Sequence, residues 1–330
     1  MKVFRAETLH DAAYQELLCL LRDGGIIAFP TDTTYGLGVD PFNTAAVDRI
    51  FQTKGRAETK PILLVVDSIE MADSVSHPLP VFHEVVEKFW PGPLTLVVRK
   101  ACQVPDVATA GGPTVALRMP AHPVALALLK TADMPLAAPS ANRSARLSPT
   151  LAQHVLRDLD GRIAMILDGG ATAGGLESTV LDLTSPTPRL LRPGLVSPAE
   201  IESVVGPISR AAGSDGGPAR SPGMQEKHYA PRTPLECVHD GAGRVKELVG
   251  QGLKVAWVTF RKGEAGELTR ILPNDPRQYA TMLYATLHEL DEAGADRIVV
   301  DLPPDREEWQ AVRDRLFRAG AKADNSFSGA

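Results

Sequence analysis

The chain is poor in cysteine, in long apolar runs and in excess positive charge. Its three cysteines, Cys19, Cys102 and Cys237, are far apart and form no Cys-x-x-Cys pair, which predicts neither a disulfide framework nor a zinc site. We expect all three to be buried free thiols. No run of about 18 uncharged apolar residues occurs, and the first residues lack the apolar core of a signal peptide. These absences favour a cytoplasmic protein without a membrane partner, and no residue is predicted to be a metal ligand.

The charge balance limits the expected partners. The formal net charge is -5 at pH 7, so the chain lacks the basic excess that supports non-specific nucleic-acid binding. We expect weak or no direct nucleic-acid binding, and any anion site must be built from local cations. With 330 residues, 44% of them hydrophobic, the chain can bury a normal core and is most simply divided into two domains.

Residues 1–205 show the alternating apolar patterns of an α/β domain. Ser197 begins a capping box with Glu200, and Ser148 is predicted to cap another helix in a Ser-Pro-Thr sequence. Thr44 is a third predicted cap. The pattern predicts helices at 13–21, 44–51, 81–89 and 124–130, and strands at 26–29, 61–66, 94–98, 114–119, 136–138, 163–167 and 179–183.

Composition shifts to Gly, Ser, Pro and charge between residues 206 and 233, which predicts a linker or lid. Beyond it, residues 234–330 are predicted to form a small parallel α/β domain of about 100 residues. Its predicted elements are strands at 254–260 and 297–302 and helices at 278–293 and 309–318.

The segment Pro30-Thr-Asp-Thr-Thr-Tyr-Gly-Leu-Gly38 crowds hydroxyls and a carboxylate into one turn after a buried strand. Gly36 and Gly38 allow the backbone to approach a ligand closely. The alternative is a turn that only satisfies its own hydrogen bonds. About one helix later come Lys54, Arg56 and Lys60. These three cations are predicted to share one loop between a helix and a strand, where they could converge on a triphosphate; the alternative is a solvated basic loop.

Two further segments place polar groups at strand ends. Thr114, Ala116 and Arg118 fall on one face of a predicted strand. Because Arg118 lies among apolar neighbours, it needs an anionic partner. This is either a carboxylate of the protein, which is the commoner case, or a carboxylate of a substrate. Ser140 and Asn142 follow another short strand and form a plausible nucleotide or phosphate cradle, although turn and cap duty also explains such residues.

A glycine-rich loop at residues 168–178 enters a strand but lacks the Gly-Lys-Ser/Thr ending of a Walker sequence. Arg192 adds a cation at a later strand end, where a surface turn is the alternative. In the linker, His228 and Tyr229 form an aromatic pair that predicts a lid over a bound nucleotide; a Tyr229 that merely pins the linker is equally compatible with the sequence.

In this order, these segments closely resemble the Sua5/YrdC family, and specifically its long two-domain Sua5 form. The resemblance covers almost the whole chain. It implies an α/β fold in which a twisted mixed-sheet YrdC-like catalytic domain (1–205) is joined by a long linker (206–233) to a small Rossmann-like parallel α/β domain (234–330). The segments that carry it are 30–38, 54–56, 140–142, 148–150, 175–180, 192–194 and 221–231.

The resemblance implies a nucleotidyltransferase. Such an enzyme converts L-threonine, bicarbonate or carbon dioxide, and ATP into threonylcarbamoyl-AMP and pyrophosphate, with Mg2+ accompanying ATP. The product passes to the tRNA threonylcarbamoyl-transferase complex, which makes the threonylcarbamoyladenosine (t6A) beside the anticodon. The chemistry needs no enzyme nucleophile, so positioning and charge neutralisation should carry catalysis.

The resemblance also implies roles for individual residues. Lys54 and Arg56 are the implied catalytic residues, near the phosphates or the carbamate. L-threonine is implied to bind at Thr33, Arg118, Ala138 and Ser178. ATP is implied to bind at Arg56, Lys60, Thr114, Ser140, Asn142, Ser148, Arg192 and Tyr229.

Two positions depart from the family pattern. Val65 stands where many members have a threonine-contacting histidine, and Ala145 stands where the Ser-Ala-Asn motif usually continues into glycine. Two other functions remain open as alternatives. One is an enzyme of the carbamoyltransferase type that forms carbamoyl-AMP, although the companion zinc cysteines or transferase domain are not evident. The other is a double-stranded RNA-binding module, against which the acidic balance argues.

Overall fold

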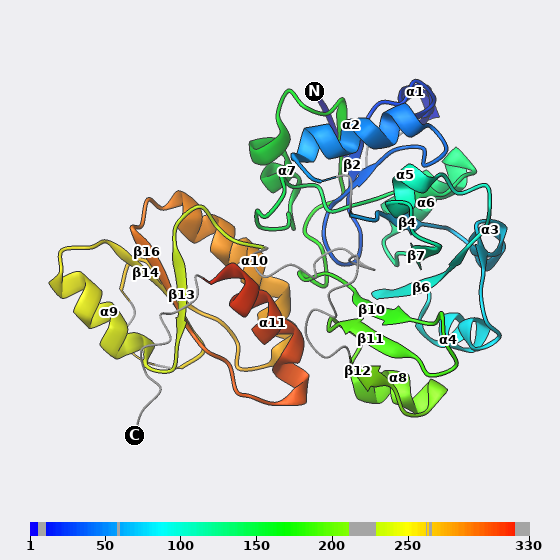
Figure 1. The fold of residues 1–330 in the computed structure, drawn as a ribbon. Coiled ribbons are helices and arrows are strands. Elements are labelled where there is room, and N and C mark those ends of the chain that lie inside the picture. The colour runs from blue at the N-terminus through cyan, green and yellow to red at the C-terminus, as the bar shows by residue number, and fades with distance from the viewer. Residues whose placement is uncertain (6–10, 58–59, 211–228, 262, 264–265, 321–330) are drawn as a thin grey trace. The chain divides into compact units, whose positions relative to one another are not determined.

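The computed structural model describes the chain except residues 6–10, 58–59, 211–228, 262, 264–265 and 321–330, and the side chains of 11–14. It divides into two compact units (Figure 1), Met1–Ser144 with Ser148–Met224, and Ala145–Leu147 with Gln225–Ala330. The predicted linker at 206–233 lies largely in 211–228, outside the described residues, so its boundaries stay a prediction. Within its described part, Ser209–Arg210 form a strand, β12.

The first unit contains two sheets. The first is four-stranded and has the order β1 (Lys2–Arg5), β9 (Met165–Asp168), β2 (Ile27–Phe29), β3 (Gly36–Gly38). The second is eight-stranded and mixes parallel with antiparallel pairs. Its order is β12, β11 (Arg189–Arg192), β10 (Thr179–Asp182), β6 (Leu94–Lys100), β7 (Thr114–Arg118), β4 (Leu63–Val65) and β8 (Leu136–Ala137), with β5 (Ser76–His77) paired to β6.

The short strand β8 links these two sheets. On one side it pairs with β4, and on the other side Ala137 exchanges two backbone hydrogen bonds with Val39, with N···O distances of 2.9 and 3.3 Å. Just beyond it, the Leu37 amide donates to the Pro139 carbonyl at 2.7 Å. Residues that follow β2 in the first sheet are therefore fixed relative to strands of the second sheet.

Apolar spacing explains the helices of this unit. In α4, Phe82, Val85 and Val86 are buried at helical spacing, and the helix spans Val81–Phe89 as predicted. The capping box of Ser197 and Glu200 is confirmed at α8. The other helices are α1 (Asp11–Arg22), α2 (Thr44–Lys54), α3 (Ile69–Ser74), α5 (Asp106–Thr109), α6 (Pro123–Ala132), α7 (Ala152–Leu159) and α8 (Pro198–Val205).

Two predicted caps are wrong. Asn43, and not Thr44, caps α2, because its side chain accepts the Ala46 amide at 3.1 Å. The N-cap of α7 is Leu151, which has no side-chain cap bond, and Ser148 lies before it. The hydroxyl of Ser148 bonds elsewhere, as described below.

The second unit is a four-stranded, all-parallel sheet with the order β13 (Leu235–Val238), β16 (Arg297–Asp301), β14 (Val255–Thr259), β15 (Thr269–Ile271). Figure 1 shows α9 (Gly241–Gly250) on one face of this sheet and α10 (Pro276–Glu292) and α11 (Gln310–Ala319) on the other, with a short 3-10 turn at Glu307–Trp309 before α11. Helices on both faces of a parallel sheet are the expected Rossmann-like arrangement.

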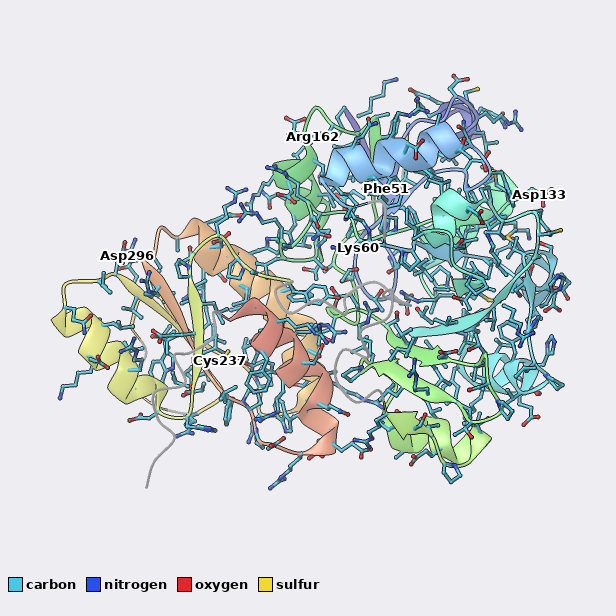
Figure 2. The ribbon with its side chains drawn as sticks, viewed as in Figure 1. Phe51, Lys60, Asp133, Arg162, Cys237 and Asp296 are labelled. Atoms are coloured by element: carbon cyan, nitrogen blue, oxygen red, sulfur yellow. The ribbon has the colours of Figure 1, made fainter. Side chains whose placement is uncertain are left out.

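The cysteines are free, as predicted, but not all are buried. Cys19 and Cys102 are exposed, and Cys237 is half-buried. Figure 2 labels Cys237, whose thiol lies 3.7 Å from the Leu316 carbonyl; burial raises its pKa to about 12. The expectation of three buried thiols is therefore wrong for the first two, because Cys19 lies on an exposed position of α1 and Cys102 lies in the exposed turn after β6.

Candidate active site

Four strands of the large sheet bring polar side chains to one end of it. β7 ends at Arg118, β11 ends at Arg192, β10 begins directly after Ser178, and β6 begins one residue before Thr95. Val180 lies opposite both Thr95 and Arg192 in register, and the β6–β7 register continues from Leu96 and Leu117 toward Thr95 and Arg118. Because paired residues project to the same face, these four side chains share one face at one sheet end.

Arg118 is buried, at 3% exposure, and is fully engaged by the protein. Its guanidinium donates to the Gly92 carbonyl at 3.0 Å, to Thr33 Oγ1 at 2.7 Å and to Asp32 Oδ1. Burial lowers the pKa of Arg118, Asp32 opposes that shift, and the nearby charge of Arg192 adds to it. Of the two anionic partners predicted for Arg118, the carboxylate of the protein is the one in this structure.

The hydroxyl-rich turn is partly self-satisfied. Thr31 Oγ1 donates to the Thr34 carbonyl at 2.6 Å and accepts two backbone amides of the same turn at 3.2 Å. Tyr35 donates to the Gly170 carbonyl at 2.7 Å, and burial raises its pKa. Thr33 differs, since it bonds both Thr31 Oγ1 and Arg118. The turn therefore satisfies many of its own hydrogen bonds, and ligand binding by Thr33 stays a prediction.

Arg192 is paired with Ser178 across the start of β10. It donates to the Ser178 carbonyl at 3.2 and 2.9 Å and to the Ser178 hydroxyl at 3.2 Å. A Cβ at Gly194 would lie 2.2 Å from the Thr179 amide nitrogen, so only glycine allows this close approach. The sequence argument missed Thr95, whose Oγ1 lies 2.7 Å from Ser178 Oγ. A hydroxyl inside the apolar run Leu-Thr-Leu was the available signal.

Lys54 does not lie in the cationic loop, which corrects the predicted placement. It is the last residue of α2, just before the Gly55 C-cap, and is 3% exposed. Its ammonium group donates to the backbone carbonyls of Ser140 and Asn142, the latter at 2.5 Å. Burial lowers its pKa well below the ordinary value, and the charges of Arg56 and Lys60 add to that shift. Lys54 therefore holds the Ser-Ala-Asn segment in place.

Arg56 and Lys60 remain in the loop after α2 and are half-buried. Arg56 donates to the Pro61 carbonyl at 2.9 Å. Burial and the charge of Arg56 lower the pKa of Lys60, which Figure 2 labels. Thr114 shares the face of Arg118 but begins β7, four residues away, or roughly 13 Å at the usual rise of a strand. The face is long enough for two ligand groups.

The segment after β8 carries the predicted cradle. Ser140 forms a bridge with Gly36, and the Ala138 amide donates to the Leu63 carbonyl at 2.7 Å. Ser148 Oγ donates to Glu177 Oε1 at 2.5 Å, which explains why it does not cap α7. This contact connects the cradle to the glycine-rich loop. In the cradle itself, the side-chain amide of Asn142 donates to the Arg143 carbonyl at 3.0 Å.

Tyr229 belongs to the second unit, where its ring lies 6.1 Å from that of Tyr284 and 5.3 Å from the guanidinium of Arg315. Its φ of 62° is in the left-handed region. The Ala230 amide donates to the Ala145 carbonyl at 3.0 Å. The predicted lid also includes His228, which lies outside the described residues, so the lid stays a prediction.

Val65, where the chain departs from the family pattern, lies opposite Arg118 in the β4–β7 register. It is buried in an apolar cluster with Ile27, Phe29 and Leu136. A branched apolar side chain therefore occupies the position opposite Arg118 on the neighbouring strand. Within the part of the chain that the structure describes, no three His, Cys, Asp or Glu residues cluster as metal ligands, and no helix is long and apolar enough to cross a membrane.

Comparison with known proteins gives two family matches. The model described as "Telomere recombination" (Sua5_yciO_yrdC) matches residues 19–194, and the model described as "Threonylcarbamoyl-AMP synthase, C-terminal domain" (Sua5_C) matches residues 196–321. The chain belongs to the Sua5/YrdC family. Its two matched regions correspond to the long form of the Sua5/YrdC family that the sequence motifs resemble.

Members of the Sua5/YrdC family match over nearly the full length. The threonylcarbamoyl-AMP synthase of Bacillus subtilis is 38% identical over 94% of this chain and 93% of its own length. That of Pyrococcus abyssi is 40% identical over 91% of both. A crystal structure of P. abyssi Sua5 with L-threonine superposes with a TM-score of 0.88 at 36% identity, covering 97% of this chain and 98% of that one. The predicted fold is confirmed.

Proposed function

We propose that this chain is an L-threonylcarbamoyladenylate synthase, a nucleotidyltransferase that makes threonylcarbamoyl-AMP and pyrophosphate from L-threonine, bicarbonate or carbon dioxide, and ATP. The product supplies the t6A modification of tRNA. The observation that carries this proposal is the joint placement of Arg118, Thr33, Ser178 and Arg192 at one sheet end, in a chain that aligns over most of its length with synthases of this name.

The reaction needs two events at one place. The amine of threonine forms a carbamate, and the carbamate oxygen then attacks the α-phosphate of ATP while pyrophosphate leaves. No group of the enzyme has to form a bond, so positioning and neutralisation of charge supply the rate. The described residues fit this requirement, because the site is rich in hydroxyls and guanidinium groups.

The two ligands divide the site. For L-threonine we propose Arg118 on the carboxylate, with Thr33, Ala138 and Ser178 around the rest of the molecule. For ATP we propose Arg192 near the α-phosphate, because Arg192 contacts Ser178, one of the proposed threonine ligands. The other proposed ATP ligands are Arg56, Lys60, Thr114, Ser140, Asn142, Ser148 and, from the second unit, Tyr229.

We propose that Lys54 acts on ATP binding indirectly, through the Ser140–Asn142 segment. The two side-chain hydrogen bonds of Lys54 that the described residues show go to carbonyls of the Ser140–Asn142 segment, so we propose that it positions that segment. A magnesium ion would be held mainly by the triphosphate and by water, which fits the lack of clustered carboxylates among the described residues. It would offset phosphate charge beside Arg56 and Lys60.

Two further parts of the proposal concern the cell. The product would be passed to the complex that transfers the threonylcarbamoyl group to tRNA, in the cytoplasm, without strong tRNA binding by this chain. The net charge of -5 supports that division of labour, because a tRNA-binding surface needs a local basic excess.

The test is pyrophosphate release by the purified chain, with L-threonine and bicarbonate omitted in turn. We expect release only when ATP, threonine and bicarbonate are all present. Release that is indifferent to threonine but requires carbamoyl phosphate would favour the carbamoyl-AMP alternative. Salt-sensitive binding of duplex RNA without any release would favour the RNA-binding alternative.

A further inference from the structure

Among the described residues, Asp32 is the one carboxylate in direct contact with the guanidinium of Arg118. Only one of its two carboxylate oxygens accepts hydrogen bonds in that part of the chain. Oδ1 accepts from Arg118 and from the Ala121 amide at 2.9 Å. Oδ2 is buried and has no hydrogen-bond partner within the described part of the chain, while the side chain as a whole is 14% exposed. An unpaired buried carboxylate oxygen is costly unless a ligand pairs with it.

The charges around Asp32 match those of a free amino acid. Arg118 and Arg192 contribute two positive charges that act on each other, and Asp32 contributes one negative charge. A zwitterionic amino acid brings a carboxylate for the guanidinium groups and an ammonium for an acidic group. Without Asp32, the ammonium would face only the positive charges of Arg118 and Arg192 among these three groups.

The position of Asp32 directly beside Arg118 also fits the short separation between the two charged groups of an α-amino acid. In any α-amino acid the nitrogen and the carboxylate carbon are separated by only two bonds, so the acceptor of the ammonium must stand directly beside the group that binds the carboxylate. Asp32 stands there, since its Oδ1 touches Arg118. The Gly174 amide also donates to the Asp32 carbonyl at 2.8 Å, which fixes the backbone of this residue against the glycine-rich loop.

We propose that Asp32 binds the ammonium of the amino-acid substrate through Oδ2 while Oδ1 keeps Arg118 oriented toward the substrate carboxylate. This inference rests on the proposed function, because it takes L-threonine as the ligand. Asp32 would then make the site bind an α-amino acid more tightly than a hydroxy acid of the same shape.

The competing explanation is that Asp32 only orients Arg118. The two explanations differ for a ligand that keeps the carboxylate and hydroxyl of threonine but lacks its nitrogen, which is (R)-3-hydroxybutanoate. If Asp32 binds the ammonium, its removal weakens threonine and spares this acid. If it only orients Arg118, both ligands weaken together.

The experiment is calorimetric titration of the full chain with L-threonine and with (R)-3-hydroxybutanoate. For Asp32→Asn we expect threonine binding to weaken roughly 10- to 100-fold, as for loss of a charged hydrogen bond, and binding of the deaminated acid to stay unchanged. Asp32→Glu, which keeps the charge, should retain most of the preference for threonine. Asp40→Asn is the matched control, because Asp40 also accepts a backbone amide, that of Phe42 at 2.8 Å, but contacts no arginine in the described structure.

Equal weakening of both ligands, or unchanged threonine binding, overturns the role of Asp32. If Asp32→Asn does not fold, the wild-type chain still decides, since equal affinity for the two ligands also overturns the proposal. A wild-type chain that binds neither ligand and releases no pyrophosphate contradicts the proposed function itself, which keeps the two failures distinct.

Discussion

Two cationic regions of the first unit differ in how the protein holds them. At the sheet end, Arg118 and Arg192 are buried at 3% and 7% exposure, and strand register and protein partners fix both. In the loop after α2, Arg56 and Lys60 are half-buried, and Arg56 donates to a carbonyl five residues away. The first region is held by distant parts of the chain, whereas the second includes a contact within its own loop.

The difference teaches that charge alone does not define a subsite. A rigid guanidinium with fixed partners suits a small ligand whose carboxylate must be oriented, because little entropy is lost when it binds. A more exposed pair suits a flexible triphosphate, whose charge is spread over several oxygens. Variants in the two regions should therefore separate amino-acid use from ATP binding.

Arg118→Ala is expected to have the largest effect. It removes the guanidinium and leaves Asp32 and Thr33 without their charged partner, so kcat/KM for L-threonine should fall by about 100-fold or more. The affinity for ATP should change far less. Arg99→Ala is the control, because Arg99 lies on the adjacent strand β6 but is exposed. Equal losses for the two substrates would contradict the separation of the regions.

Arg56→Ala should produce the converse pattern on a smaller scale. Loss of one charge-assisted contact should weaken ATP binding by roughly tenfold, with little change in the KM for threonine. Titration with a non-hydrolysable ATP analogue measures the first quantity, and initial rates measure the second. A rise in the threonine KM as large as the loss of ATP affinity would show that the loop serves both ligands.

Lys54, at the end of α2, lies between the two regions in the sequence. Lys54→Met should change how the free energy of unfolding depends on pH. Since burial lowers the pKa of Lys54 in the folded chain, the unfolded chain binds more protons between that lowered pKa and the ordinary value, and the free energy of unfolding rises with pH. The wild type should gain up to about 1.4 kcal/mol per pH unit from this group, and the variant should lose that slope. Urea unfolding at pH 7 and pH 9 measures it. The exposed Lys88, also in the last turn of a helix, provides the control Lys88→Met, for which an unchanged slope is expected.

Ala145→Gly is expected to have the smallest effect and the opposite sign. Ala145 is exposed and has a φ of 66°, a conformation that costs an alanine but not a glycine. Relief of that strain, less the entropy glycine gains when unfolded, should stabilise the chain by roughly 0.5–1 kcal/mol. Ala199→Gly, in the exposed first turn of α8, should instead destabilise it. A loss of stability at both positions would remove strain as the explanation.

Local patterns in the sequence predicted much of the fold. The helix at 81–89 follows from the spacing of Phe82, Val85 and Val86, and the Ser197 capping box is a short-range signal. The pattern did not predict β3, which consists of Gly36–Gly38, because a strand of two glycines and a leucine has no β-propensity of its own. Pairing with β2 and the bridges to the segment after β8 create it.

The candidate site was predictable in its residue types but not in its contacts. Ser148 has the sequence signature of a cap, yet its partner is Glu177, 29 residues away. Lys54 is at the boundary between helix and loop, so its burial depends on carbonyls 86 and 88 residues away. Asp32 and Arg118 are also 86 residues apart. Nothing in local spacing encodes such pairs, because tertiary packing chooses between the available partners.

The two-residue strand β8 affects how the first unit unfolds locally. Its hydrogen bonds to Val39 on one side and its pairing with β4 on the other mean that neither sheet can separate without breaking it. Hydrogen exchange should therefore reveal one cooperative opening unit, in which the amides of Leu37, Val39 and Ala137 exchange at a common rate. Asp32 follows a strand of one sheet and Arg118 ends a strand of the other, so a strand that contains neither residue helps to set the distance between the two groups proposed to bind the ends of the amino acid.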